Sequence, residues 1–274
     1  MDLITIAAKT HPGMKRGENQ DHFGFFMPED GHIPEKGILA AVADGMGGHF
    51  GGATASRMAI NVLISEFYRT GAKSIPESLN AAFQKANMAI YDKGQSNSEL
   101  KGMGTTLSAA VFKDDKFFWA HVGDSRGYII HKNQTRQFTN DHSYVAELLM
   151  AGVITRSEAS THSKKNVITR AVGVSPILKV DISSKHGRLK MGQYVLLCSD
   201  GLSKVVSDEQ VVRTINRLRS PAAVCDNLIS AANRLGGPDN ITVVVIRKNR
   251  DVQNDTFIKN LLNFQNKTFT SGGK

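Results

Sequence analysis

Five aspartates in this chain stand where a fold can hold a carboxylate firmly, at the end of an apolar run or in a tight turn. They are Asp21, Asp44, Asp124, Asp200 and Asp239. Carboxylates brought together at low dielectric repel one another, and a divalent cation compensates that repulsion. Oxygen-only ligands favour magnesium or manganese, and no Cys/His spacing indicates zinc. Two such ions about 3.5–4 Å apart can activate a water for in-line displacement at phosphorus.

The chain is organised around the stretch Ile38–His49, ILAAVADGMGGH. An apolar run bounded by turn residues predicts a buried strand, with Asp44 at its end. The glycines that follow allow a sharp turn and a close approach to a ligand. Similar runs end in Asp-Gly at Tyr194–Gly201 and in Gly-Asp at Phe117–Asp124. The pattern does not show that these aspartates converge, and five unrelated turn aspartates would give the same pattern.

A competing motif is GDSRG at 123–127, which fits the nucleophile elbow of esterases. That elbow needs a strand before it and a helix after it. Gly127–His131 (GYIIH) instead predicts another strand, and His186, the last histidine, does not come late enough for the triad. We therefore interpret this match as accidental.

The two cysteines, Cys198 and Cys225, do not fit a cysteine phosphatase, which needs an arginine six residues after its nucleophile. Lys204 and Ala231 stand there instead. Two cysteines form no disulfide framework and favour a reducing compartment. No stretch is long and apolar enough to span a bilayer, and Met1–Thr10 lacks the features of a signal peptide. We expect a cytoplasmic protein with no membrane partner.

Composition favours one globular domain with a short tail, since the 274 residues are 41% hydrophobic and 22% charged. The formal net charge of +9 favours anionic partners such as nucleic acid or phosphorylated protein. The basic residues are scattered, and no basic helix or aromatic-basic interleaving of a nucleic-acid reader is present. We therefore expect no nucleic-acid partner, and we expect a monomer.

The expected elements run as strands, two helices, a strand-rich middle, two more helices and a last strand. Helical spacing and caps predict helices over 53–69, 76–93, 207–218 and 221–235, with short helices at 142–151 and 155–160. Ser74 with Glu77 has capping-box spacing, and Gly94 is expected to end the second helix. Long helices grouped in pairs beside strand-rich segments predict sheets covered by helices rather than alternating βαβ units.

Seven motifs, in order, resemble the metal-dependent serine/threonine protein phosphatases of type 2C. They are Arg16 with NQD at 19–21, ADGMGGH at 43–49, GMGTT at 102–106, HVGDSR at 121–126, NDHS at 140–143, CSDG at 198–201 and GGPDNIT at 236–242. The resemblance covers roughly residues 3–248. It implies an α+β fold: a four-layer α/β/β/α sandwich in which two antiparallel sheets pack face to face between helical pairs.

The resemblance also implies a role for each matching residue. Asp44 resembles the carboxylate that bridges two metal ions, with the Gly45 carbonyl as a further ligand. Asp200 and Asp239 resemble the other direct carboxylate ligands, and Asp21 would act on the same cluster directly or through a water. The cofactors expected from this are two or three manganese or magnesium ions.

Asp124 resembles a ligand of the weaker third metal ion of bacterial members. Arg16 resembles the arginine that grips the substrate phosphate, because a guanidinium bonds two phosphate oxygens at once. The segment 142–166 corresponds to the flap beside the site. The resemblance implies a phosphatase domain over residues 1–249 and leaves 250–274 as a polar tail.

Two residues depart from the pattern of many eukaryotic members and match bacterial ones. Met46 replaces a histidine proposed as general acid, so a metal-bound water, His49 or His142 would have to protonate the leaving group, and we assign that role to none of them here. Gln20 replaces a glutamate, which weakens the case for a direct ligand there.

The resemblance implies an enzyme that hydrolyses phosphoserine and phosphothreonine on proteins. The attacking group would be a hydroxide bridging two metal ions, without a phospho-enzyme. The partners implied are a serine/threonine kinase or its phosphorylated targets, whose modification the enzyme would reverse. The alternative is a catalytically silent protein of the same fold that binds nucleic acid or a phosphoprotein through its basic surface.

Overall fold

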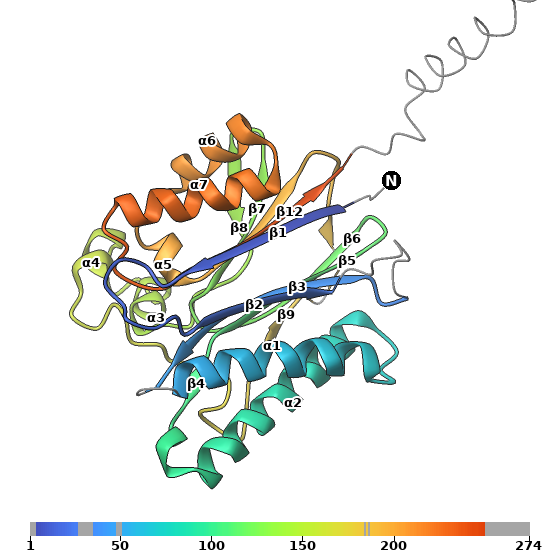
Figure 1. Ribbon diagram of the computed structural model, residues 1–274, viewed down its shortest axis with the longest axis vertical. Coiled ribbons are helices and arrows are strands. Elements are labelled where there is room, and N and C mark those ends of the chain that lie inside the picture. Colours follow the sequence, from blue (N-terminus) through green and yellow to red (C-terminus); the bar gives the residue numbers. More distant parts are fainter. Residues whose placement is uncertain (1–3, 27–34, 48–50, 184, 186, 250–274) are drawn as a thin grey trace, which may run out of the picture.

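The computed structural model describes residues 4–26, 35–47, 51–183, 185 and 187–249 of the chain. Figure 1 shows four layers: two β-sheets that lie face to face, with a pair of long helices on the outside of each. The predicted α+β sandwich is confirmed. The predicted tail, residues 250–274, lies outside the described residues.

The first sheet has five antiparallel strands. Their order is β1 (Ile4–His11), β12 (Ile241–Lys248), β11 (Tyr194–Cys198), β7 (Arg126–His131) and β8 (Gln134–Gln137). It is covered by α6 (Asp208–Leu218) and α7 (Pro221–Arg234).

The second sheet has seven strands. The main path is β10 (Gly187–Arg188), β6 (Lys116–Val122), β5 (Leu107–Lys113), β3 (Ile38–Met46) and β2 (Asp21–Phe26), while β4 (Gly104–Thr105) pairs with β3 and β9 (Asp181–Ile182) with β6. Its outer face is covered by α1 (Gly51–Arg69) and α2 (Ile75–Ser96). Four short helices complete the described elements: η1 (Ser98–Leu100), α3 (Tyr144–Met150), α4 (Arg156–Thr161) and α5 (Asp200–Ser203).

Alternation along β3 explains why this strand is buried on both faces. Leu39, Ala41 and Ala43 pack into the cluster under α1 and α2. Ile38, Ala40 and Val42 pack into the cluster between the two sheets. A strand whose successive side chains meet two different hydrophobic layers reads as one continuous apolar run. The same alternation directs the next even residue, Asp44, toward the space between the sheets.

Local signals predicted the helix starts well. Ser74 and Glu77 form the capping box of α2, and Ser207 and Gln210 form that of α6. The prediction that Gly94 ends the second helix was wrong, because α2 continues to Ser96. Gly94 is buried, and a Cβ there would lie only 3.3 Å from the Leu100 carbonyl oxygen. This glycine lets the backbone of Leu100, in η1, approach α2 closely.

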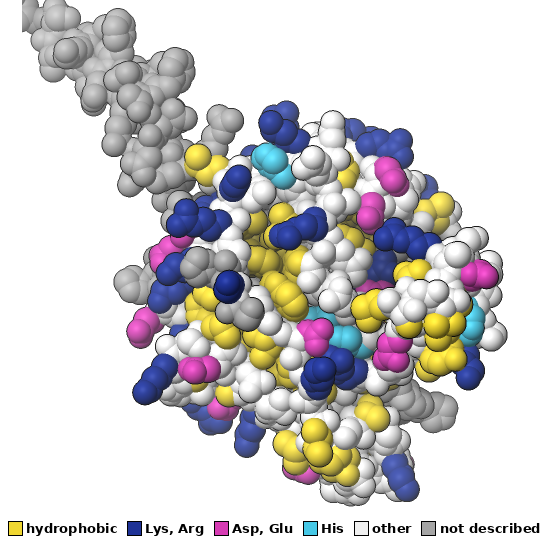
Figure 2. Space-filling model, turned by 180° about the vertical axis from the view of Figure 1, so that it is seen from behind, with side chains coloured by type: hydrophobic (Ala, Val, Ile, Leu, Met, Phe, Trp, Pro, Cys, Tyr) yellow, Lys and Arg dark blue, Asp and Glu magenta, His cyan; other side chains and the backbone are white. Residues whose placement is uncertain are grey.

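The described helices include none that is long and apolar enough to cross a membrane. Lys and Arg side chains are spread over the face shown in Figure 2, with Asp and Glu side chains among them. This distribution matches the scattered basic residues of the sequence and does not form one concentrated cationic surface on that face.

Candidate active site

One open cleft of about 590 Å³ brings together five of the seven residues predicted for the site. These five are Arg16, Asp44, Gly45, Asp200 and Asp239, and the cleft is also lined by Gln20, Met46, Gly47, Asn166 and Asn240, among others. They come from the end of β3, the start of α5 and the loops that follow β1 and precede β12. The other two predicted residues, Asp21 and Asp124, lie behind and beside the cleft.

Asp44 is fixed by the neighbouring GMGTT motif. Its backbone N–H donates to Thr106 Oγ1 at 2.9 Å, and its carbonyl oxygen accepts bonds from the Thr106 N–H and the Thr105 hydroxyl, both at 2.9 Å. Thr106 Oγ1 also lies 2.6 Å from Ser125 Oγ. These hydrogen bonds fix the backbone of Asp44 and leave its carboxylate oxygens available. The two threonines therefore support the site and do not line it.

The glycine turn after Asp44 has a steric cause. A Cβ on Gly45 would lie 2.1 Å from the Gly52 carbonyl oxygen and 2.6 Å from that of Gln20, so only glycine fits between these two backbones. Gly47 has a φ of 136°, a backbone conformation that residues with a side chain rarely adopt. The predicted Gly48 and His49 lie outside the described residues.

Asp21 lies directly opposite Asp44 in the β2–β3 register. Ser199 Oγ donates to Asp21 Oδ2 at 2.7 Å, whereas Asp21 Oδ1 is buried with no hydrogen-bond partner. Burial, with smaller contributions from Asp200 and Asp239, raises the pKa of Asp21 to about 7. An unpaired buried carboxylate oxygen is costly, and a nearby cation or a water bound to one would satisfy it.

The pKa of Asp44 is raised well above its ordinary value. Burial is the largest cause, and the charges of Asp21, Asp200, Asp124 and Asp239 add to it. Five carboxylates therefore act on one another at this end of the sandwich, a convergence that the sequence pattern alone left open. Without a compensating positive charge, they cannot all stay ionised.

Arg16 is held over the cleft by the loop before β12. Its Nη2 donates to Asp239 Oδ2 at 2.9 Å. The amide of Asn240 fastens the arginine's loop, because Nδ2 donates to the carbonyl oxygens of Pro12 at 2.9 Å and Glu18 at 2.8 Å, while Oδ1 accepts the Gln20 N–H at 2.9 Å. Hydrogen bonds between the loop that contains NQD and the loop that contains GGPDNIT thus fix the position of Arg16 at the cleft.

Asp124 does not line the cleft. It lies in a neighbouring cavity of about 650 Å³ between the body of the protein and the segment 142–166. Burial raises the pKa of Asp124 to about 6. Its Oδ2 is 3.5 Å from the ammonium of Lys204, which is also 2.5 Å from Asp200 Oδ2. The sequence prediction did not include Lys204, although its i,i+4 spacing from Asp200 would have indicated an ion pair if a helix had been expected there.

The donor atoms of the cleft suit a hard divalent ion. Among the described residues, no group of three or more His, Cys, Asp and Glu side chains is arranged to hold a metal ion by itself. The cleft does present all-oxygen donors, namely the carboxylates of Asp44, Asp200 and Asp239 and the backbone of Gly45. Asp21 Oδ1 and Asp124 Oδ1 are buried without partners. Magnesium keeps several waters and uses few protein carboxylates, so this donor set fits magnesium or manganese.

His142 is turned away from the cleft. Its Nδ1 accepts the Gly123 N–H at 3.0 Å, and its Nε2 lies 3.2 Å from Asp181 Oδ2. Burial lowers its pKa. His142 supports the Gly123–Asp124 turn and does not reach the cleft, so it is not placed to protonate a leaving group there.

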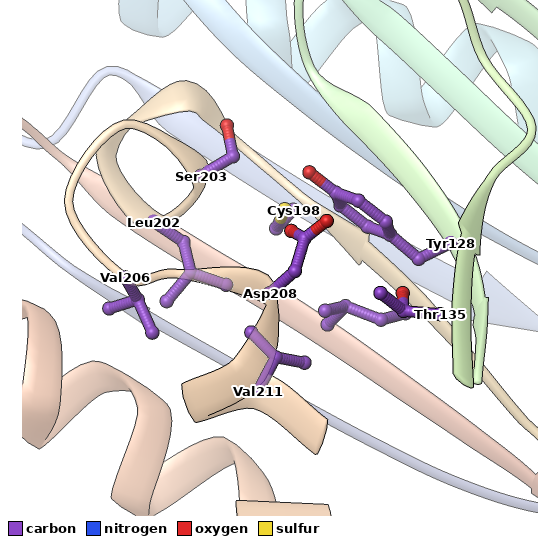
Figure 3. Close-up of a pocket in the computed structure, with 9 residues that line it drawn as sticks. Tyr128, Thr135, Cys198, Leu202, Ser203, Val206, Asp208 and Val211 are labelled. Atoms are coloured by element: carbon purple, nitrogen blue, oxygen red, sulfur yellow. The ribbon is translucent and has the colours of Figure 1, made fainter. Parts of the chain in front are cut away.

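Cys198 does not take part in catalysis either. Figure 3 shows it in a small hollow between Tyr128 of β7 and Asp208 at the start of α6, on the side of the first sheet that faces the helices. Burial raises the pKa of the thiol to about 12, which keeps it protonated and unreactive. Gly127 lies within strand β7, which confirms that the GDSRG match is not an esterase elbow.

Comparison with known proteins gives one consistent result. The protein phosphatase 2C family profile matches residues 15–237. A serine/threonine phosphatase stp of Listeria welshimeri is 38% identical over 245 residues, which are 88% of this chain and 94% of that protein. The crystal structure of the Mycobacterium tuberculosis serine/threonine phosphatase PstP/Ppp is 34% identical with a TM-score of 0.79, covering 90% of this chain and 99% of that one.

A crystal structure of the catalytic domain of serine threonine protein phosphatase PstP in complex with two manganese ions has a TM-score of 0.76. It is 33% identical and covers 90% of this chain and 99% of that one. The family profile covers every residue that lines the cleft except Asp239 and Asn240, which lie just beyond its last matched residue. The chain therefore belongs to the protein phosphatase 2C family and is a protein-serine/threonine phosphatase, a hydrolase of phosphate esters.

Proposed function

We propose that this phosphatase uses two manganese or magnesium ions, bound at the cleft, to hydrolyse phosphoserine and phosphothreonine on proteins and thereby reverses a serine/threonine kinase. The observation that carries this proposal is the placement of Arg16 beside mutually repelling carboxylates. Arg16 provides a donor for phosphate, while Asp44, Asp200 and Asp239 provide anionic oxygens for cations. The two manganese ions of the PstP complex support the same cofactor here.

The chain's own residues have distinct tasks in this mechanism. When bound, the ions supply an activated water and stabilise charge at phosphorus. Asp44, Asp200, Asp239 and the Gly45 carbonyl would hold the ions, and Asp21 would act on the same cluster directly or through a water. Met46 lines the cleft but cannot donate a proton, and none of the described cleft residues is a histidine. We therefore assign the proton of the leaving alcohol to water.

Arg16 is suited to hold the substrate because it is anchored and still accessible. One edge of its guanidinium binds Asp239, yet 57% of the side chain is exposed. The planar group has five N–H donors, so it can bind phosphate oxygens while keeping Asp239. Asp239 is then a positioning residue for Arg16 as well as a ligand. The substrate phosphate would lie between Arg16 and the ions.

Replacing Arg16 with alanine should raise KM for a phosphothreonine peptide by about tenfold, because charge-assisted bonds to the phosphate are lost. Arg16→Lys should recover only part of that loss, since an ammonium cannot bind two oxygens in a fixed fork. Steady-state kinetics with manganese would measure both. The exposed Lys85→Gln on α2 is a control that should leave KM unchanged. Equal KM for wild type and Arg16→Ala would contradict the assignment.

The proposed cofactor is tested by hydrolysis of p-nitrophenyl phosphate and of a phosphothreonine peptide with manganese, magnesium or EDTA. We expect turnover with manganese or magnesium and none with EDTA, restored when the metal is returned. Activity that persists in EDTA after dialysis would refute the metal mechanism. The names of the relatives favour the enzyme over a catalytically silent binding protein. The kinase partner, the cytoplasmic location, the monomeric state and the absence of a nucleic-acid partner stay predictions.

A further inference from the structure

Lys204, the residue directly after α5, places a positive charge between two of the aspartates. Its Nζ is 2.5 Å from Asp200 Oδ2 and 3.5 Å from Asp124 Oδ2. The same ammonium donates to Asn166 Oδ1 at 3.1 Å, at the end of the segment 142–166. Asp124, Asp200 and Asn166 belong to three separate parts of the chain. The ammonium therefore connects these three segments and is more than an ion pair within one surface helix.

Among the described residues, Lys204 is the one cation that forms an ion pair with Asp124. Asp124 is only 4% exposed, and its other oxygen has no hydrogen-bond partner. A buried carboxylate of this kind needs a counter-charge. The chain itself supplies this charge from a side chain that is tethered nearby, and a tethered group has a high effective concentration at its site.

The ammonium and a metal ion cannot share this position. An ion coordinated by both Asp124 and Asp200 would have to lie between their carboxylates, where Nζ now lies. Two cations that close together repel each other, and they would compete for the same carboxylate oxygens. Binding an ion there therefore requires Lys204 to move out and to give up its bonds to Asp200 and Asn166.

Lys204 also lies on the boundary between the two cavities. Lys204 and Asp124 line the cavity under the segment 142–166, whereas Asn166 and Asp200 line the catalytic cleft. The bond from Lys204 to Asn166 thus joins this segment to α5 at the edge of the cleft. Displacing the ammonium would break that connection as well as the ion pairs.

We propose that Lys204 takes the place of a third divalent ion, so that this phosphatase binds two ions and Asp124 serves as the partner of Lys204 instead of as a metal ligand. This inference rests on the metal pair of the proposed function. It makes Lys204 a positioning residue that sets the number of ions and holds residue 166 against the cleft.

The test is the stoichiometry of manganese binding, measured by equilibrium dialysis of the full chain followed by metal analysis. Wild type should saturate at two ions per chain. Lys204→Gln should bind a third ion with an affinity about tenfold or more above any third site of the wild type, because the competing charge is gone. Lys204→Arg keeps the charge and should bind two ions. Lys204→Gln with Asp124→Asn should return to two, and the surface control Lys85→Gln should not differ from wild type.

Three wild-type ions of comparable affinity would overturn the inference, and this result needs no variant to fold. Two ions in both wild type and folded Lys204→Gln, checked by circular dichroism, would also overturn it, since Lys204 would then exclude nothing. Both results leave the proposed metal pair intact. Wild type that binds no manganese would instead refute the proposed function and, with it, this inference.

Discussion

Asp44→Asn should lower kcat for a phosphothreonine peptide by on the order of a thousandfold, and the metal-free variant should be more stable than metal-free wild type. The loss of activity follows from removing the central carboxylate that holds the ions. The gain in stability follows from burial and from the repulsion by four other aspartates that Asp44 experiences without metal. Asparagine keeps the shape of the side chain and leaves the backbone bonds to Thr105 and Thr106 in place.

Two measurements check this prediction: steady-state kinetics with manganese, and urea unfolding in EDTA. Asp92→Asn on the exposed face of α2 is the matched control, and it should change neither quantity appreciably. A variant that is inactive and also less stable in EDTA would show that Asp44 is a structural residue. A fully active variant would remove Asp44 from the site.

The stabilisation that manganese gives should increase as the pH rises from about 5 to about 8. In the metal-free folded protein, burial raises the pKa of Asp21, which acts on the metal cluster of the proposed function, to about 7 from the ordinary 3.8. The pKa of Asp44 is raised too. A carboxyl group with a raised pKa stabilises the fold while it is protonated, and this contribution is lost as the pH rises through the folded pKa. Metal replaces the protons, so its benefit is greatest at high pH.

Urea unfolding with manganese and with EDTA, at pH 5, 6, 7 and 8, measures this difference. Each carboxyl group that exchanges a proton for metal adds up to about 1.4 kcal/mol per pH unit to it. Three histidines with lowered pKa act in the opposite direction on absolute stability, and they largely cancel in the difference: His22, His121 and His142. A difference that stays constant or shrinks with pH would contradict the prediction.

The sandwich was predictable because its signals are local. The capping box predicted for α2 and the helical spacing of the long helices depend on residues three and four positions apart. The buried run before Asp44 also indicates a central strand by itself. Short elements such as β8 and α5 escaped prediction because few residues define them. Gly94 was misjudged because its role depends on Leu100, across a turn that no local pattern describes.

The site was predictable in its residue types and less so in its arrangement. Motif resemblance singled out Arg16 and Asp44, and the structure brings them to one cleft. It did not indicate that Asp124 lies in the neighbouring cavity, because that depends on how the segment 142–166 packs. Lys204 was missed for a similar reason: its ion pairs with Asp124 and Asp200 depend on how the fold places these carboxylates around it.

The pairing of β1 with β12 has a consequence for the timing of synthesis. The first described strand aligns with the last, from Ile4 opposite Lys248 to His11 opposite Ile241. Contacts between residues so distant in sequence form late and slow the folding of a chain. A ribosome must therefore release the chain beyond Lys248 before the loop of Arg16 can be fastened by Asn240. A nascent phosphatase would therefore remain inactive until the last strand of the sandwich has left the ribosome.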